Sequence, residues 1–157
     1  MRVDQKIDVN VPRDRVYNQW TQFEEYPRFM EGIVEVEQLD DTRLRWVAEV
    51  SGERKEWYAK ILRQVPDEVV SWESEGGTVN SGTVIFKPLD GNRTEVEVHM
   101  EFEPEGVKEQ VGGALQVPDR RVAGDLKRFK EFIETRGTET GGWRGEVEHG
   151  APRDRGL

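Results

Sequence analysis

The strongest structural signal in this sequence lies in residues 44–61, which read Leu-Arg-Trp-Val-Ala-Glu-Val-Ser-Gly-Glu-Arg-Lys-Glu-Trp-Tyr-Ala-Lys-Ile. Apolar and polar side chains alternate through both halves of it. The apolar set comprises Leu44, Trp46, Ala48, Val50, Trp57, Ala59 and Ile61. A period of two places these side chains on one face of an extended chain, so the stretch predicts two β-strands with one buried face.

The two strands are expected to form a hairpin, because Gly52-Glu53 suits a two-residue turn with glycine first. This turn predicts that Trp46 lies opposite Ala59. It also predicts that Ala48 lies opposite Trp57, so that a large side chain meets a small one in each pair.

The same alternation continues on both sides of this hairpin, across residues 33–103. The further inner-face positions are Val34, Val36, Val70, Trp72, Val84, Phe86, Val96, Val98, Met100 and Phe102. Pro66-Asp67 is typical of a turn between two of the strands. The pattern therefore predicts an antiparallel meander with one face in water.

The parity of the pattern also predicts the length of the loop at residues 90–92, Asp-Gly-Asn. A three-residue loop pairs Phe86 with Val96, whereas a two-residue loop would place Phe86 opposite Glu95. Because a slip of one residue turns every side chain to the other face, we expect the longer loop.

The N-terminal residues 2–9 alternate in the same way and predict another half-buried strand. Pro12 then suits the first turn of a helix. Apolar residues follow at helical spacing, at Val16, Tyr17, Trp20 and Phe23. The stretch 26–30, Tyr-Pro-Arg-Phe-Met, is expected to break this helix and to begin another short one.

The period becomes helical after Pro104. A first, short helix is expected over residues 107–115, where the pair Gly112-Gly113 would weaken it and allow it to act as a gate. Pro118 fits the first turn of a long second helix over residues 118–136. The apolar stripe of this helix comprises Val122, Leu126, Phe129 and Ile133.

Gly137 is a plausible stop for this helix, and residues 137–157 that follow are rich in glycine and charge. Only Trp143 and Val147 among them look capable of burial. The composition predicts a disordered tail, with docking of Trp143 on the body as the alternative. The domain is therefore expected to span residues 1–136.

Composition limits the possible partners. The 157 residues carry a net charge of −9 and contain no cysteine. A strongly acidic surface repels phosphate backbones, so nucleic acid is not an expected partner. No apolar run reaches signal-peptide or membrane-spanning length, which predicts a cytoplasmic protein without an integral membrane segment.

The order strand, two short helices, six strands and long helix resembles the polyketide cyclase/dehydrase family. The most specific part is residues 23–30, Phe-Glu-Glu-Tyr-Pro-Arg-Phe-Met, followed by Val-Glu-Val at 34–36. This family belongs to the START-like (SRPBCC, helix-grip) superfamily, which includes the birch-pollen-allergen fold and the coenzyme Q-binding proteins. The resemblance covers residues 1–136. It implies an α+β fold in which a seven-stranded curved antiparallel sheet wraps around the long C-terminal helix.

The resemblance further implies a cavity between the sheet and the long helix, lined by the inner-face residues. Its candidate lining residues are Phe29, Trp46, Trp57, Arg63, Trp72, Ser74, Phe86, Met100, Phe102, Leu126 and Phe129. The three tryptophans among them suit a wall that stacks on a flat or isoprenoid ligand. Equally, three indoles are bulky enough to fill much of a modest cavity.

Polar chemistry is sparse on the predicted inner face. Arg63 is the one basic residue that parity sends inward, where it either meets a polar ligand head or reaches back to solvent. Ser74 and Asn80 are the other inward polar candidates. His99 falls on the outer face, so neither a catalytic base nor a metal site is expected from it.

These features predict a protein that binds or carries an apolar small molecule such as a lipid, a quinone-like isoprenoid or an aromatic metabolite. A cyclase or dehydratase that shapes a reactive chain in the same cavity is the alternative. An interaction module acting through the acidic surface or the tail is a third. We expect no cofactor and no metal, and the sequence predicts no particular ligand or oligomeric state.

Overall fold

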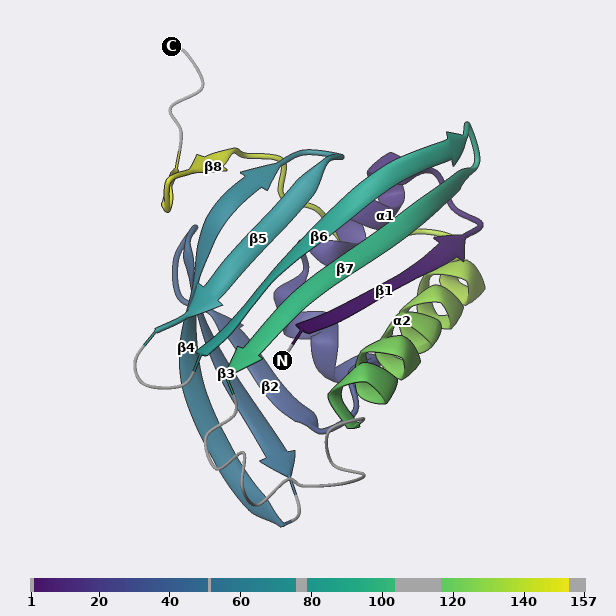
Figure 1. Ribbon diagram of the computed structural model, residues 1–157. Coiled ribbons are helices and arrows are strands. Elements are labelled where there is room, and N and C mark those ends of the chain that lie inside the picture. Colours follow the sequence, from purple (N-terminus) through teal and green to yellow (C-terminus); the bar gives the residue numbers. More distant parts are fainter. Residues whose placement is uncertain (1, 51, 76–78, 104–116, 153–157) are drawn as a thin grey trace.

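The computed structural model (Figure 1) describes residues 2–50, 52–75, 79–103 and 117–152. Its strands are β1 (Arg2–Val9), β2 (Ile33–Gln38), β3 (Arg43–Val50), β4 (Glu53–Val65), β5 (Val69–Ser74), β6 (Val79–Asp90), β7 (Arg93–Glu103), β8 (Val147–Glu148) and β9 (Ala151–Pro152). Its helices are α1 (Arg13–Trp20), the 3-10 helix η1 (Phe23–Arg28) and α2 (Val117–Arg136).

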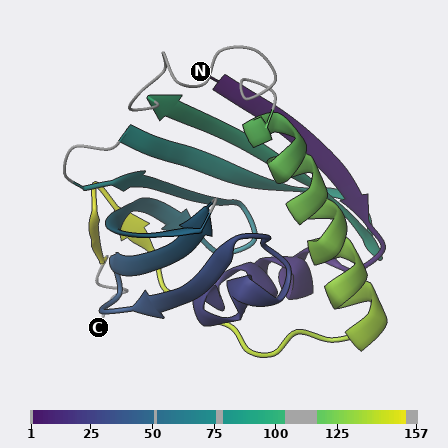
Figure 2. The same ribbon diagram turned by 90° about the horizontal axis from the view of Figure 1, so that it is seen from below.

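The main sheet is antiparallel and has the order β1-β7-β6-β5-β4-β3-β2. It curves so that its inner face encloses the helices (Figure 2). Helix α2 packs along β1, α1 packs on β6 and β7, and η1 packs on β2. The expected seven-stranded helix-grip arrangement is confirmed, with β8 and β9 added beside β4.

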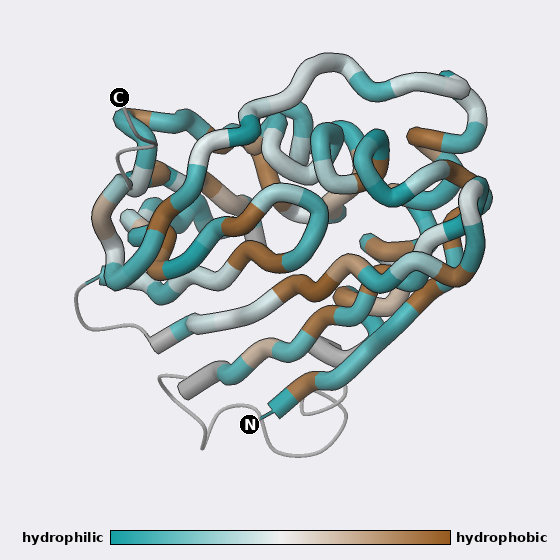
Figure 3. Tube along the Cα trace, turned by 90° about the horizontal axis from the view of Figure 1, so that it is seen from above, coloured by the Kyte–Doolittle hydropathy of each residue, from teal (hydrophilic) through white to brown (hydrophobic). Residues whose placement is uncertain are grey.

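Alternation of apolar and polar residues along the strands is visible in Figure 3, where brown and teal follow one another through the sheet. The inner positions Val3, Val84, Val96 and Val98 are almost fully buried. Burial of these alternate side chains against the helices is what fixes the register of the sheet.

The register predicted for β6 and β7 is confirmed, since Phe86 pairs with Val96. The connection between the two strands differs slightly from the expected three-residue loop. Asp90 pairs with Arg93, and the extra residue forms a bulge after Pro88. A two-residue turn with one bulged residue gives the same parity as a three-residue loop.

The register predicted for β3 and β4 is wrong by two residues. Trp46 lies opposite Trp57, not Ala59, and Ala48 lies opposite Lys55. The turn is centred one residue earlier than expected, and Gly52 adopts a positive φ of 80° in it. A left-handed backbone favours glycine, which places Gly52 second in the turn.

The two short N-terminal helices are present with shifted bounds. Pro12 lies immediately before α1 instead of inside it, and the second helix begins at Phe23 rather than at Tyr26. The Tyr26 hydroxyl donates a 2.7 Å hydrogen bond to the Trp20 carbonyl, which ties the two helices together.

The long helix has the expected apolar stripe, as Val122, Leu126, Phe129 and Ile133 are all buried. It ends at Gly137, whose backbone N–H donates to the Ile133 carbonyl and whose φ is 75°. The expected helix at 107–115 and its glycine gate lie outside the described residues.

The prediction of a disordered tail is wrong for residues 137–152. Val147 is fully buried and Trp143 packs against the core. Thr140 and Gln19 exchange hydrogen bonds of 2.8 and 3.1 Å, and Val147 pairs with Gln64 of β4. We call residues 138–150 the C-terminal strap. The local composition concealed it, because its few apolar side chains reach sites formed by distant parts of the chain.

Candidate functional site

The inner face of the grip divides into two parts. At the closed end, Phe29, Phe86, Leu126 and Phe129 are between 0% and 3% exposed. The rings of Phe86 and Phe129 pack edge to face with Trp20, with centroids 4.9 Å apart for Trp20 and Phe129. These four predicted lining residues therefore form packed core, in contact with protein on all sides.

At the open end the inner-face side chains are only partly buried. They are Trp46, Trp57, Trp72, Ser74 and Met100. The three indoles follow one another along β3, β4 and β5, and we call them the aromatic row. The side chain of Phe102, also predicted to line the site, lies outside the described residues. The structure thus separates the predicted lining residues into a core group and a more accessible aromatic group.

Trp46 and Trp57 form a stacked pair. Their ring centroids are 6.0 Å apart and their planes differ by 7°. The pair follows directly from the observed register, in which the two residues are cross-strand neighbours. Tyr26 contacts the other side of Trp46 at 5.6 Å. Two large side chains therefore pack against each other where a large-against-small pair was expected.

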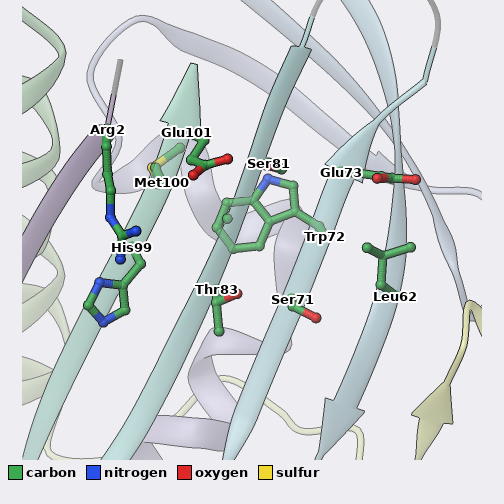
Figure 4. A pocket seen from close by; sticks show the side chains of 11 residues that line it. Arg2, Leu62, Ser71, Trp72, Glu73, Ser81, Thr83, His99, Met100 and Glu101 are labelled. Atoms are coloured by element: carbon green, nitrogen blue, oxygen red, sulfur yellow. The ribbon is translucent and has the colours of Figure 1, made fainter. Parts of the chain in front are cut away.

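Trp72 lies over Gly82 of the neighbouring strand β6. A Cβ atom on residue 82 would be 2.5 Å from Cζ2 of Trp72, so only glycine fits beneath the ring. Figure 4 shows this indole face-on in a view in which the strands are also seen face-on. The ring therefore lies along the sheet and presents its flat face, which is the orientation that stacking on a ligand requires.

Two buried polar atoms accompany the aromatic row. Trp46 Nε1 and Asn80 Oδ1 have no hydrogen-bond partner among the described residues. The Asn80 backbone N–H donates a 2.9 Å hydrogen bond to Ser74 Oγ. A ligand oxygen near Trp46 and a ligand hydroxyl near Asn80 would satisfy these atoms, because buried polar groups are usually paired.

The prediction that Arg63 points inward is wrong. A β-bulge in β4 between Ile61 and Arg63 changes the phase of the strand, so the Arg63 side chain is 53% exposed and pairs with Glu148 of β8. Gln64 takes the inward position and is 1% exposed. Parity alone does not reveal a bulge, which is why the sequence pattern misplaced both residues.

His99 lies on the outer face, as predicted. Its two ring nitrogens contact Asp4 and Glu97, and hydrogen bonding to Asp4 raises the pKa of the imidazole. It borders a depression of about 370 Å³ over β5, β6 and β7, whose lining includes Ser71 and Thr83 (Figure 4). Trp72 and Met100 also line it, so this depression adjoins the aromatic row at Trp72.

Residues 2–50, 52–75, 79–103 and 117–152 contain no group of three or more His, Cys, Asp or Glu side chains placed to hold a metal ion. Within the same ranges, no helix has the length and apolarity needed to cross a membrane.

The strand order and the long C-terminal helix define an α+β fold of the helix-grip type. The chain belongs to the family described as polyketide cyclase / dehydrase and lipid transport, whose model matches residues 9–133. The resemblance to this family noted in the sequence is thereby confirmed, whereas the relationship to coenzyme Q-binding proteins stays a prediction.

The chain is also similar to several known proteins. The chain is 49% identical to an uncharacterized 17.2 kDa protein in the melC2-rnhH intergenic region of Streptomyces lincolnensis, over 93% of this chain and 98% of that one. It resembles the solved structure of DR_A0006 from Deinococcus radiodurans, with 27% identity, a TM-score of 0.69, and coverage of 87% and 99%. The Zhui aromatase/cyclase from Streptomyces sp. R1128 shares the fold, with 21% identity, a TM-score of 0.72, and coverage of 91% and 99%.

Sequence reasoning overlooked Gly82 and Gln64. Gly82 interrupts an otherwise regular strand, and glycine inside a strand often marks a close approach of another group. That signal was available in the sequence. No comparable signal marks Gln64 in the sequence, because its inward position depends on the bulge in β4.

Proposed function

We propose that this protein binds and carries a flat or isoprenoid, largely apolar small molecule at the open end of the grip, between the sheet and α2. The observation that carries the proposal is the orientation of the aromatic row. Trp46 and Trp57 are parallel, and Trp72 lies flat over Gly82. All three indoles are only partly buried and Trp72 lies along the sheet, so the row offers aromatic surface on which a flat ligand can stack.

The two ends of the inner face support the same location. The closed end is packed with side chains that are almost fully buried, so a ligand there would have to displace core. The open end combines partly buried aromatic surface with Met100, a flexible side chain that adapts to ligands of different shape. Lipid, quinone and aromatic metabolites all match such a surface.

A cyclase or dehydratase activity in the same place is the second candidate. It is favoured by the family and by the side-by-side position of Ser74 and Asn80 next to the aromatic row. Both side chains are neutral, so their role in this case would be to orient a substrate oxygen while the aromatic surface holds the chain in a reactive shape.

Native mass spectrometry of gently purified protein tests the carrier proposal. We expect a mass increment from a co-purified small molecule, which is then identified and titrated back while tryptophan fluorescence is recorded. A substitution at Ser74 or Asn80 separates the candidates. A carrier keeps the ligand chemically unchanged in wild type and variant, whereas an enzyme converts it and slows on substitution. Absence of any bound species together with unchanged fluorescence across a panel of lipids, quinones and aromatic ketones contradicts both.

A further inference from the structure

A group of unpaired polar atoms lies in the interior, away from the aromatic row. It comprises Tyr17 Oη, both amide atoms of Gln64, and Asp67 Oδ1, each buried without a hydrogen-bond partner among the described residues. Tyr17 is 0% exposed and Gln64 is 1% exposed. We call these three residues the polar junction. Native proteins pair the large majority of such groups, so an unpaired set in one place needs an explanation.

The three side chains act on one another. Burial raises the pKa of Tyr17 to about 12, and the nearby Gln64 amide and the charges of Arg144 and Asp67 modify that pKa. Gln64 is thus close to the phenol oxygen without forming a well-aligned hydrogen bond to it. The Arg144 guanidinium lies 5.6 Å from the Tyr17 ring centroid and donates a 2.7 Å hydrogen bond to Asp67 Oδ2.

The backbone is shaped to bring these groups together. The bulge in β4 turns Gln64 inward, and Asp67 in the next turn has a positive φ of 67°. A positive φ is uncommon for residues other than glycine, although Asp tolerates it better than most, and bulges are frequent beside functional sites, where they re-aim a side chain. The C-terminal strap then covers the junction, with Val147 paired to Gln64 and Arg144 over Tyr17.

The unpaired atoms match one small species. Gln64 Nε2 and Tyr17 Oη are donors, while Gln64 Oε1 and Asp67 Oδ1 are acceptors. A cation would leave the amide N–H groups unpaired, and an anion would be repelled by Asp67. Water donates and accepts, and buried waters typically satisfy about three such groups. We infer that the polar junction is a binding site for ordered water that joins α1, β4 and the β4–β5 turn beneath the C-terminal strap.

Two measurements test this site, and neither depends on the proposed ligand. The first compares the melting temperature of Tyr17→Phe with that of Tyr26→Phe, a matched control whose hydroxyl donates to the Trp20 carbonyl. If water pairs with the Tyr17 hydroxyl, both variants melt about 2–4 °C below wild type, the shift expected for loss of one buried hydrogen bond in a chain of this size. An unchanged or raised melting temperature for Tyr17→Phe alone overturns the inference.

The second measurement is a crystal structure at a resolution that resolves ordered water. We expect density within about 2.7–3.2 Å of Tyr17 Oη and of the Gln64 amide. Gln64→Leu should lose that density and melt at a lower temperature than wild type. If density is missing in the wild-type crystal, or if Gln64→Leu is more stable than wild type, the groups are unpaired in fact and the water site is rejected.

Discussion

The six-membered ring of Trp72 lies directly above the Cα of Gly82, at a separation that leaves no room for a side chain at residue 82. Gly82 and Trp72 are cross-strand neighbours in β6 and β5, and Gly82 also pairs with Met100 in β7. This one contact decides whether Trp72 stands up into the interior or lies along the sheet. The proposed function requires the second arrangement, because it leaves the face of the ring available to a ligand.

Gly82→Ala should therefore disturb both stability and binding. The added methyl group forces Trp72 to move, which we expect to lower the free energy of unfolding by about 1–3 kcal/mol, the usual cost of overpacking. Ligand affinity should fall at least about tenfold if the ring is tilted into the site. Chemical denaturation and fluorescence titration measure the two effects.

Gly91→Ala is the matched control for Gly82→Ala, because a Cβ there meets no atom within 4 Å. Its stability should stay within about 0.5 kcal/mol of wild type. A Gly82→Ala protein that folds and binds as well as the Gly91→Ala protein would show that the position of Trp72 is unimportant.

The stacked pair of Trp46 and Trp57 leads to a second prediction. Trp57→Ala removes one member of the stacked, partly buried pair, and an aromatic contact contributes about 0.5–1.5 kcal/mol, so ligand affinity should fall by about two- to tenfold. Trp143→Phe, in the C-terminal strap, is the control and should leave affinity unchanged. Equal losses in the two variants would point to general destabilisation in place of a local contact.

Periodicity in the sequence predicts some of these cross-strand contacts and not others. The period-two pattern correctly predicted which side chains of β6 and β7 face inward, because burial of alternate valines and Phe86 permits only one register. It did not predict that Trp46 would stack on Trp57. That pairing depends on the position of Gly52 in its turn, which both candidate registers accommodate without changing the buried face.

The predictions for Arg63 and for the C-terminal strap were wrong for a different reason. An extra residue in β4 reverses parity locally, and no periodicity argument detects it when a polar residue lies on either side. The strap is held by long-range contacts such as Thr140 with Gln19, which composition cannot indicate. The first error removed the only cation predicted at the candidate site, and the second concealed the segment that covers Gln64 and Tyr17.

Stability should depend on the C-terminal strap. Val147 is fully buried against β4, and Val147→Ala removes two methyl groups from the core, for an expected loss of about 2 kcal/mol. Ala151→Ser, at an exposed position of β9, should change stability by less than about 0.5 kcal/mol. A strap that contributes nothing would leave the two variants equally stable in urea.

The outer-face cluster of Asp4, His99 and Glu97 should make stability depend on pH. Hydrogen bonding to Asp4, together with Glu97, raises the pKa of His99 above its ordinary 6.5. The stabilisation from charged His99 is therefore complete below pH 6.5 and is lost as the pH rises through the raised pKa. Conversely, His99 lowers the pKa of Asp4, and the pKa of Glu97 is lowered by Lys87 first and by His99 second. The stabilisation that these two ionised carboxylates contribute is therefore lost as the pH falls through their lowered pKa values.

The consequence is a window between the carboxylate and imidazole titrations. His99→Asn should destabilise the protein more at about pH 5.5 than at about pH 8.5, as measured by urea unfolding at each pH. His149→Asn, at an exposed position in the C-terminal strap, serves as the control. A difference between wild type and His99→Asn that is the same at both pH values would show that the contacts with Asp4 and Glu97 contribute no charge-dependent stability.

The location of the ligand is tested most directly by the indole N–H signals of the five tryptophans in a heteronuclear NMR titration. Each signal is assigned by a Trp→Phe variant, and the probes are a short-chain isoprenoid quinone, a polycyclic aromatic ketone and a lysophospholipid. Binding at the open end predicts shifts of Trp46, Trp57 and Trp72, with Trp20 and Trp143 unchanged. Shifts confined to Trp20 or Trp143, or no shift with any probe, would contradict a ligand site on the aromatic row.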